Sequence, residues 1–322
     1  MGGSDRNHSL AEFAPAGAKK TESIFGRNSF LPENPAIAAS VEAFARGAQR
    51  RCDPDRPGAQ RSGSGSKISN FHTHTVYCDG KDTPRELAEE AVRLGCPALG
   101  FSGHSYTAYD PDCCMSPEGT AAYRREVLAL REKYAGKLDI RLGLEQDYYS
   151  ELPREEYDYL IGSVHAVKKN GEYVIVDWSR DMLLKGVEKL YGGDIYAFAE
   201  DYFRLVGDLW ERTRCRIIGH FDLLTKFNED GTLLDETHPR YLRAAGEALD
   251  RLLEAPVLFE INTGAMARGY RTTPYPGPIL RRAIARKGGT FILSSDCHRK
   301  EQLLYGLADQ LNQPYERVEE AP

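Results

Sequence analysis

Two histidines stand one residue apart where a short apolar run of the chain ends. The run is "ISNFH" (68–72); Thr73 and His74 follow it, and Asp79 lies five residues further on. Side chains at positions i and i+2 of an extended strand point to the same side. His72 and His74 would therefore direct both imidazoles at one spot, as in a metal site. An exposed His-x-His pair without a function is the alternative interpretation of this motif alone.

Other histidines and acids follow further apolar runs in the same way. Six of the eight histidines fall at the ends of such runs, and so do Glu145 and Asp296. The carboxyl ends of parallel strands meet on one face of a barrel or sheet, so these side chains would converge. His8 and His238 lie outside the pattern, and we interpret both as bystanders. The nine candidate metal ligands are His72, His74, Asp79, His104, Glu145, His165, His220, Asp296 and His298.

The types of these side chains indicate which metals they would hold. Imidazole and carboxylate together favour zinc, iron or manganese. Nine donors exceed what one ion takes, so two or three divalent ions are predicted, and Glu145 could bridge two of them. For any single member, a buried, hydrogen-bonded histidine or a simple ion pair is the alternative. Cys78 and Cys297 adjoin two of the acids, but neighbours in an extended stretch point to opposite sides, so we expect small buried thiols there.

Apolar, β-branched runs alternate with helical patterns from residue 68 onward. The runs are continuously apolar, which is typical of strands buried on both faces. Strands alternating with helices predict an α/β fold with a parallel sheet, either a barrel or a doubly wound sheet. The expected strands are 68–72, 98–104, 138–145, 159–165, 215–220, 257–262 and 290–298, and the expected helices are 83–95, 120–134, 194–213, 239–255 and 275–288.

The clearest helix signal lies in "TPRELAEEAVRLG" (83–95). Thr83 is expected as the N-cap, Pro84 as the first helical residue, and Glu86 as the partner that closes a capping box. Gly95 is expected to end the helix. This helix would follow the His-x-His segment directly and fix the loop that carries Asp79.

The two ends of the chain differ in composition from its main part. Residues 1–67 are rich in Gly, Ala, Ser and Arg and end in "RSGSGSK", a composition typical of flexible linkers. We expect 1–67 to be a disordered extension and 68–322 to form one catalytic domain. The closing "LNQPYERVEEAP" contains prolines and acids, so the domain is expected to have an abbreviated C-terminus.

Charge and cysteine content restrict the partners and the compartment. The chain has 322 residues and a net charge of −6, and its acidic excess lies in residues 68–322. An acidic body disfavours nucleic-acid binding and suits a small substrate held by a few local cations. Seven cysteines without a Cys-x-x-Cys pair suit free thiols in a reducing compartment. With no signal-peptide core and no apolar run long enough to span a bilayer, a cytoplasmic protein without membrane contact is expected.

Four segments of the sequence resemble the motifs of the PHP family (polymerase and histidinol phosphatase). They read "HTHTVYCDG", "GFSGHS", "GLEQDYY" with "IGSVHAV", and "SSDCHRKE" after "GHFDLLTKFN". The resemblance implies a distorted (β/α)7 barrel and a trinuclear metal centre. It assigns one metal to His72, His74, Glu145 and Asp296, a second to Glu145, His165 and His220, and a third to Asp79, His104 and His298.

The segment "FEINTGAMARGYRTTPYP" resembles the histidinol-phosphatase branch of this family. The branch implies hydrolysis of L-histidinol phosphate to L-histidinol and phosphate, a step of histidine biosynthesis, by water that the bound metals activate. In this interpretation the catalytic residues are His72, His74, Glu145, His165, His220 and Asp296. Arg268, Lys226 and Arg271 are the candidates for binding the phosphate. A phosphoesterase acting on nucleic-acid ends or on phosphotyrosine, and a non-catalytic metal-binding protein, are the alternatives.

Overall fold

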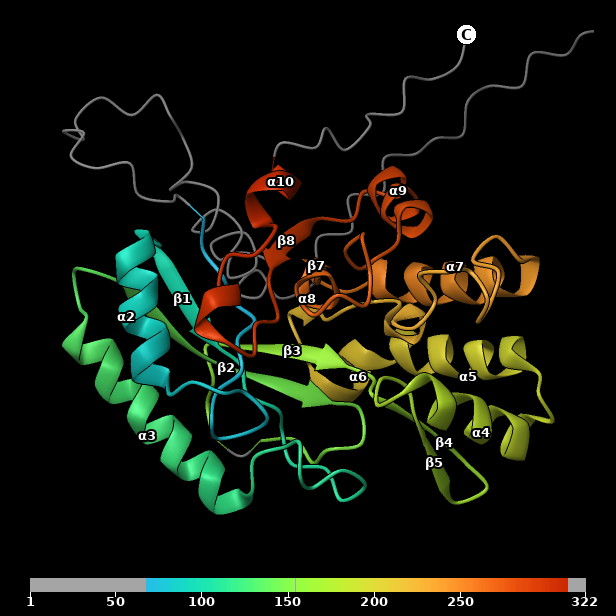
Figure 1. Cartoon of the computed structure of the whole chain (residues 1–322), viewed down its shortest axis with the longest axis horizontal. Coiled ribbons are helices and arrows are strands. Elements are labelled where there is room, and N and C mark those ends of the chain that lie inside the picture. Colours follow the sequence, from blue (N-terminus) through green and yellow to red (C-terminus); the bar gives the residue numbers. More distant parts are fainter. Residues whose placement is uncertain (1–67, 154, 312–322) are drawn as a thin grey trace, which may run out of the picture.

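The computed structural model of the chain describes residues 68–153 and 155–311 (Figure 1). The expected disordered extension 1–67 and the end of the expected domain, 312–322, lie outside the described residues. Within the described part, no helix has both the length and the apolar composition that crossing a bilayer requires.

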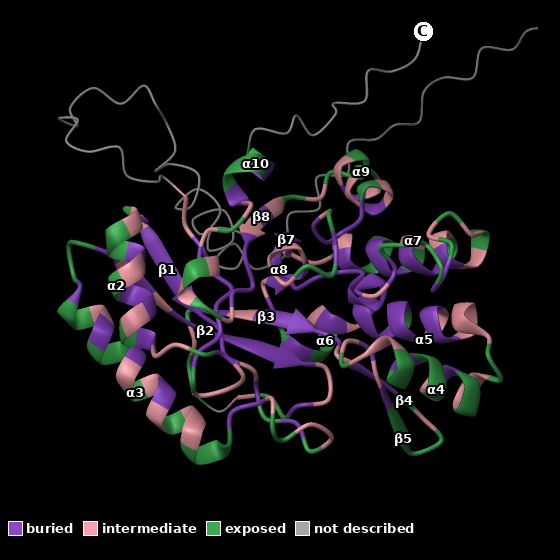
Figure 2. Ribbon diagram, viewed as in Figure 1, coloured by how far each residue is buried: buried purple, intermediate pink, exposed green. Residues whose placement is uncertain are grey.

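One parallel sheet forms the centre of the fold. Its strand order is β1-β2-β3-β6-β7-β8, and every neighbouring pair runs parallel. Buried residues dominate these strands, in agreement with the continuous apolar runs of the sequence (Figure 2). The strands are β1 (Ala98–Phe101), β2 (Asp139–Asp147), β3 (Tyr159–Ser163), β6 (Ile217–Ile218), β7 (Leu258–Asn262) and β8 (Phe291–Ser294).

The first expected strand is not a regular strand. Segment 70–74 is extended but makes only single bridges, from Asn70 to Leu99 on β1 and from Thr73 to Cys297 just after β8. Hydrogen bonds to side chains take the place of some strand-to-strand backbone hydrogen bonds: the Asn70 amide donates to Ser295 Oγ, and Ser102 Oγ accepts from the Thr73 N–H. The segment thus lies between the two outer strands of the curled sheet and closes a distorted barrel. The predicted fold class is confirmed, and the described sheet has six regular strands.

The expected helices are present, with shifted ends. The capping box of the first helix is confirmed, since Thr83 Oγ1 accepts from the Glu86 N–H and Glu86 Oε2 accepts from the Thr83 N–H. The expected helix 194–213 is broken at Asp208 into two. The helices of this group are α2 (Pro84–Leu94), α3 (Pro117–Lys133), α5 (Ile195–Gly207), α6 (Leu209–Thr213), α7 (Pro239–Leu253) and α9 (Pro278–Arg286).

An antiparallel hairpin and a further helix follow β3 and were not expected from the sequence. The hairpin is formed by β4 (Ala166–Lys169) and β5 (Glu172–Ile175), and α4 (Arg180–Tyr191) follows it. The hairpin begins directly after His165 and returns the chain to Asp177, so its strands set the position of both side chains. Two short helices, α8 (Gly264–Ala267) and α10 (Leu307–Leu311), complete the described set with the turns η1 (Leu223–Thr225) and η2 (Lys300–Gln302).

A buried tyrosine fills the interior of the barrel below the strand ends. The Tyr159 hydroxyl donates to the Phe71 carbonyl at 2.5 Å, and its ring lies against two glycines of neighbouring strands. A Cβ at Gly100 or Gly143 would lie 2.2 Å from Tyr159 atoms, so only glycine leaves room for this ring. The packed interior holds the strands in fixed register, which in turn fixes the side chains at their carboxyl ends.

Candidate metal centre

Glu145 lies at the centre of the nine predicted donors. It sits near the end of β2, 1% exposed, and both of its carboxylate oxygens face imidazoles. Five histidine nitrogens from four other parts of the chain lie within 3.5 Å of these oxygens. From Oε2 the distances are 3.1 Å to His72 Nε2, 3.5 Å to His74 Nε2 and 3.0 Å to His104 Nδ1, and from Oε1 they are 3.0 Å to His220 Nε2 and 3.3 Å to His165 Nε2.

Asp296 faces the His-x-His pair from the adjacent chain segment that follows β8. Its Oδ1 lies 3.1 Å from His74 Nε2 and 3.7 Å from His72 Nε2. The residue adopts a φ of 47°, in the left-handed region that few non-glycine residues occupy. A Cβ at Gly264 would lie 2.7 Å from Asp296 Oδ2, so this approach also requires glycine. Backbone strain of this kind is typical of functional sites.

Asp79 joins two further histidines at the outer edge of the group. Its Oδ2 lies 2.9 Å from His298 Nε2, and its Oδ1 lies 3.7 Å from His104 Nε2. The His74 ring stacks on the His298 ring, with centroids 4.2 Å apart. The structure therefore brings all nine predicted donors together in one continuous cluster.

Several donor atoms in this cluster are buried and have no hydrogen-bond partner among the described residues. They are His72 Nε2, His74 Nε2, Glu145 Oε2 and Asp79 Oδ1. Buried polar atoms in native proteins are almost always paired, so orphan atoms that point at one another indicate a bound ligand. Three sets of donor atoms lie within 4.8 Å of one another: His74, Asp79, His104 and His298; His72, His74 and Glu145; and His104, Glu145 and His165. Histidine and carboxylate donors in this arrangement fit divalent metal ions.

The carboxylates of the cluster are held in their charged form. Burial by itself would raise the pKa of Glu145, but His104, His72 and His165 outweigh it and hold the pKa well below the ordinary value. Burial would likewise raise the pKa of Asp296, and Arg268 and His72 bring it well below the usual range. Negative charge is thus maintained at the positions where cations would bind.

The imidazoles divide into two classes by their surroundings. Burial opposes protonation of His72, yet Glu260 and Glu145 raise its pKa well above the ordinary value. Burial likewise opposes protonation of His165, and Glu145 raises the pKa of His165 well above the ordinary value. In contrast, burial together with the nearby His298 and His104 lowers the pKa of His74 to about 3. A metal ion requires the deprotonated imidazole, so it would compete with protons at the first class and not at His74.

Two carboxylates that sequence reasoning did not assign hold the donors in place. Glu260 on β7 is 1% exposed, and its Oε1 lies 2.6 Å from His72 Nδ1. Asp147 Oδ2 lies 3.2 Å from His165 Nδ1. Carboxylates in these positions fix the tautomer and the orientation of a ligating imidazole. The signal for Glu260 was an acid inside the apolar run "VLFEIN", and that for Asp147 was its i+2 spacing from Glu145 on one strand.

A family model described as the PHP domain matches residues 70–264, which contain seven of the nine donors. The chain belongs to the PHP domain family. The resemblance found in the sequence motifs is thereby confirmed, and the metal-donor cluster stands at the barrel mouth of a PHP domain.

Known relatives of this PHP domain include named phosphatases. "Probable histidinol-phosphatase" from Deinococcus radiodurans is 32% identical over 261 residues, which cover 76% of this chain and 92% of the relative. A crystal structure of a candidate histidinol phosphatase from Listeria monocytogenes has a TM-score of 0.64 at 20% identity, covering 75% of this chain and 99% of its own. The histidinol phosphate phosphatase of Lactococcus lactis, complexed with zinc, L-histidinol and phosphate, has a TM-score of 0.50 at 20% identity, covering 73% and 87%. The two structures share the PHP barrel fold with this chain.

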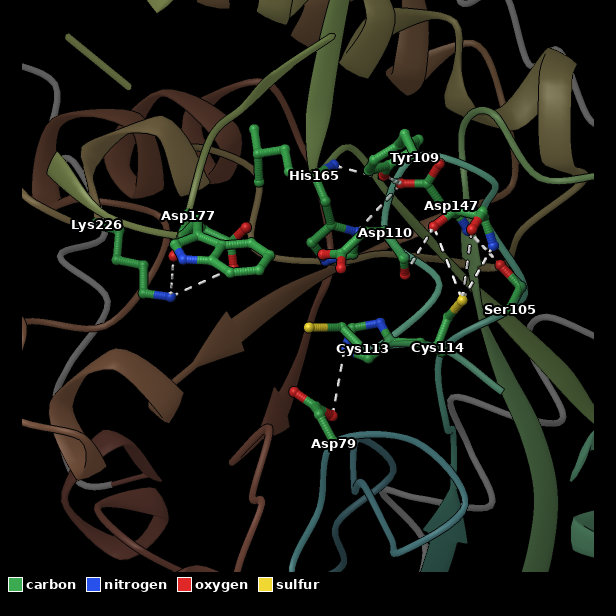
Figure 3. A pocket seen from close by; sticks show the side chains of 14 residues that line it. Asp79, Ser105, Tyr109, Asp110, Cys113, Cys114, Asp147, His165, Asp177 and Lys226 are labelled. Atoms are coloured by element: carbon green, nitrogen blue, oxygen red, sulfur yellow. Dashed lines mark hydrogen bonds and ion pairs between the residues drawn. The ribbon is translucent and has the colours of Figure 1, made fainter. Parts of the chain in front are cut away.

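Two cavities open beside the donor cluster of this PHP domain. The first, of about 250 Å³, is drawn in Figure 3, and the second has a volume of about 340 Å³. Asp79, His104 and His165 line both cavities, so both reach the metal donors. Four basic residues line the second cavity, of which Lys81 and Arg299 were not expected from the sequence and Lys226 and Arg268 were.

The three candidate phosphate-binding residues differ in their surroundings. Arg268 Nη2 lies 3.2 Å from Asp296 Oδ2, and its Nη1 lies 2.7 Å from His298 Nδ1. Lys226 Nζ donates to the Asp177 carbonyl at 2.7 Å and lies 3.3 Å from Asp177 Oδ2. Arg271 is buried, donates to the Thr225 carbonyl and lines neither cavity.

The remaining expectations concern cysteines and the bystander His238. Cys297 is fully buried and Cys78 is half-buried, and burial raises the pKa of each thiol to about 12, so both remain neutral as expected of structural side chains. His238 is the N-cap of α7, where its ring accepts from the Arg240 N–H and stacks on Tyr196. His8 lies outside the described residues.

Proposed function

We propose that this chain is a metal-dependent phosphate monoester hydrolase that converts L-histidinol phosphate and water to L-histidinol and phosphate. The observation that carries the proposal is the convergence of the nine candidate metal donors in one cluster, with Glu145 at its centre, at the mouth of a PHP barrel. The named relatives support the substrate, since histidinol phosphatases match this chain over most of their own length.

We assign the divalent ions, two or three in number, to the donors in the way that the family motifs imply. Glu145 would bridge two of these ions, because each of its oxygens faces a different set of imidazoles. The short distances between Asp79 and His298 support a third position at the outer edge. Zinc is the metal named with the Lactococcus lactis structure, and histidine and carboxylate ligands suit it.

Divalent ions held in this way supply a water that is acidic enough to attack near neutral pH, and they neutralise charge on the phosphoryl group. The chain's own residues prepare the site for this chemistry. Glu260 and Asp147 hold the rings of His72 and His165 in one orientation, which keeps the donor geometry fixed before the substrate arrives.

The basic residues of the second cavity would hold the phosphate of the substrate. Lys226 lies on the border of the two cavities and is held there by Asp177, while Lys81, Arg268 and Arg299 line the second cavity. Arginine presents a planar fork that matches phosphate oxygens, whereas lysine presents a point charge. Arg271 stays a weaker candidate, because its partners are the Thr225 carbonyl and Glu236.

The size of the cleft favours a small substrate over the two alternatives named for this fold. Cavities of about 250 and 340 Å³ suit a ligand with the size of an amino-alcohol phosphate. A nucleic-acid substrate would require a basic or aromatic track along the surface, and a phosphotyrosine protein would require a broad open face. The acidic balance of the chain also disfavours nucleic acid.

Phosphate release from purified protein tests the proposal. We expect L-histidinol phosphate to be hydrolysed in preference to p-nitrophenyl phosphate and to short single-stranded DNA, and we expect a chelator to abolish the activity. Equal rates on histidinol phosphate and p-nitrophenyl phosphate would remove the substrate assignment, and full activity in a protein shown to be metal-free would remove the metal mechanism.

A further inference from the structure

The two cavities beside the candidate metal donors share Asp79, Asp177 and Lys226 and differ in their other charged side chains. The cavity of about 340 Å³ contains Lys81, Arg268 and Arg299 in its wall, and we call it the basic lobe. The cavity of about 250 Å³ contains Asp110 and Asp147, which do not line the other cavity, and we call it the acidic lobe. The two lobes join along the candidate metal donors, so Lys81, Arg268 and Arg299 line only one part of the cleft and Asp110 lines only the other.

The acidic lobe is enclosed by loops and by aromatic side chains. Asp110 and Tyr109 come from the loop between β1 and α3, and Asp177 and Trp178 come from the chain that leaves the β4–β5 hairpin. The Tyr109 ring stacks on Tyr173 of this hairpin, with centroids 4.7 Å apart, which ties the two walls together. In Figure 3 Asp177 and Lys226 lie on one side of the lobe and Tyr109 on the other, with Asp110 between them.

Asp110 and Asp177, two of the four acids that line this lobe, differ in how their charge is compensated. Asp177 Oδ2 lies 3.3 Å from Lys226 Nζ. Asp110 has no lysine or arginine within ion-pair distance among the described residues. Burial is the main cause of the raised pKa of Asp110; Asp177 also raises it, while a hydrogen bond with Cys113 and the nearby His104 and His165 lower it. A cation in the lobe would stabilise the charged form of Asp110. Asp79 and Asp147, which also line the lobe, pair with His298 and His165, so among the described residues Asp110 is the acid of the lobe that has no ion-pair partner.

The lining of the lobe indicates an organic cation rather than a further metal ion. Within the described residues, no group of three close metal-ligating atoms includes Asp110 or Asp177. Trp178 remains 53% exposed although it is a large apolar side chain, and it lies in the wall of the lobe. An indole beside a carboxylate is a combination that recognises ammonium and imidazolium groups.

We propose that the acidic lobe binds a protonated nitrogen on the alcohol portion of the substrate, with Asp110 as the counter-charge and Trp178 as the aromatic wall. This inference rests on the proposed phosphatase function and specifies its substrate class as phosphate monoesters of amino alcohols. The phosphate lies toward the basic lobe, the cationic nitrogen lies in the acidic lobe, and the ester bond between them lies at the metal donors. Asp110 thereby selects among phosphate esters without touching the reacting atoms.

A pair of substrates of nearly equal size tests this inference. 3-Aminopropyl phosphate and butyl phosphate differ mainly in the charged nitrogen, and kcat/KM for each is measured in the metal-loaded protein. We expect the wild type to prefer the amino ester and Asp110→Asn to lose this preference by about 10- to 100-fold, the usual effect of removing a hydrogen bond to a charged group. Asp112→Asn makes the same charge change on an exposed residue of the same loop and is expected to keep the preference.

A second variant tests the inference independently of whether Asp110→Asn folds. Trp178→Leu changes an exposed side chain and is expected to lower the preference about 5-fold through loss of the cation–π contact. An unchanged preference in Asp110→Asn, or an equal loss in Asp112→Asn, overturns the inference. Wild-type hydrolysis of L-histidinol phosphate in the same assay tests the proposed function separately. If L-histidinol phosphate is hydrolysed but the preference for the amino ester does not depend on Asp110, only the inference is contradicted. If the preference depends on Asp110 but L-histidinol phosphate is not hydrolysed, only the histidinol assignment is contradicted.

Discussion

Replacement of Glu260 by glutamine tests how the metal donors are held. All four hydrogen-bond partners of the Glu260 carboxylate act as donors. Oε1 faces His72 Nδ1 and Ser294 Oγ, each at 2.6 Å, and Oε2 accepts from the His220 N–H and the Asn262 amide, each at 3.0 Å. A carboxylate can only accept, whereas the amide of glutamine must place an NH2 group on one of these two sides. In either orientation of the amide, its NH2 group faces two hydrogen-bond donors and can accept from neither.

The cost of Glu260→Gln follows from these contacts. The variant loses the charge-assisted bond to His72 and leaves buried donors unpaired, at about 1 to 3 kcal/mol each. Loss of a carboxylate that orients a ligating histidine lowers metal affinity about 10- to 100-fold. We therefore expect weaker zinc binding by at least tenfold and a lower melting temperature in Glu260→Gln.

Zinc affinity is measured by competition with a chelator, and the melting temperature is measured with and without zinc. Glu126→Gln is the matched control, because Glu126 accepts from the Tyr77 hydroxyl and is not among the metal donors or their supporting carboxylates. Wild-type zinc affinity in Glu260→Gln, within about twofold, would refute the reasoning, whatever happens to the melting temperature.

Four further predictions follow from the site. Asp296→Ala should reduce kcat by several orders of magnitude, because it removes a donor that faces the His-x-His pair, and near-wild-type turnover with full metal content would contradict this assignment. Arg268→Ala should raise KM about tenfold by loss of a phosphate contact, which an unchanged KM would exclude. Zinc affinity should rise with pH above 6.5, since the raised pKa values of His72 and His165 mean that protons must leave before the metal binds, and a pH-independent affinity would refute this. Burial raises the pKa of Asp222 from its ordinary 3.8 to about 6, so the free energy of unfolding should fall by up to about 3 kcal/mol as pH rises from about 4 to 6. Asp222→Asn should remove this pH dependence in urea unfolding, and an unchanged pH dependence would contradict the prediction.

The sequence was sufficient to predict which histidines and acids come together, and the parallel sheet explains why. Parallel strands end on one face, so a histidine or acid placed after each strand must approach the others. His104, Glu145 and His165 illustrate this, since each follows or ends a neighbouring strand and all three meet at one point. The assignment of individual ions among these donors stays a prediction.

Other features depend on contacts between distant side chains, which a single sequence does not reveal. Glu260 looks like an ordinary strand residue until the closed barrel brings its side chain to His72 of segment 70–74. The expected strand 68–72 became an irregular segment because Asn70 and Thr73 bond to side chains as well as to the backbone ladder. The hairpin β4–β5 was missed because its strands are only four residues each and partly exposed. Its position next to His165 nevertheless determines the shape of the acidic lobe.

The closure of the barrel by segment 70–74 also affects how the protein must be made. This segment leaves the ribosome before all the strands, yet its His74 N–H bonds to the Cys297 carbonyl more than two hundred residues later. A nascent chain therefore carries an incomplete ring, in which segment 70–74 can pair with β1 but lacks its partner on the other side until the residues after β8 have emerged. Contacts so distant in sequence form late in folding. A ribosome-bound chain that ends before residue 296 should consequently lack both the closed ring and a full complement of metal, whatever the zinc supply.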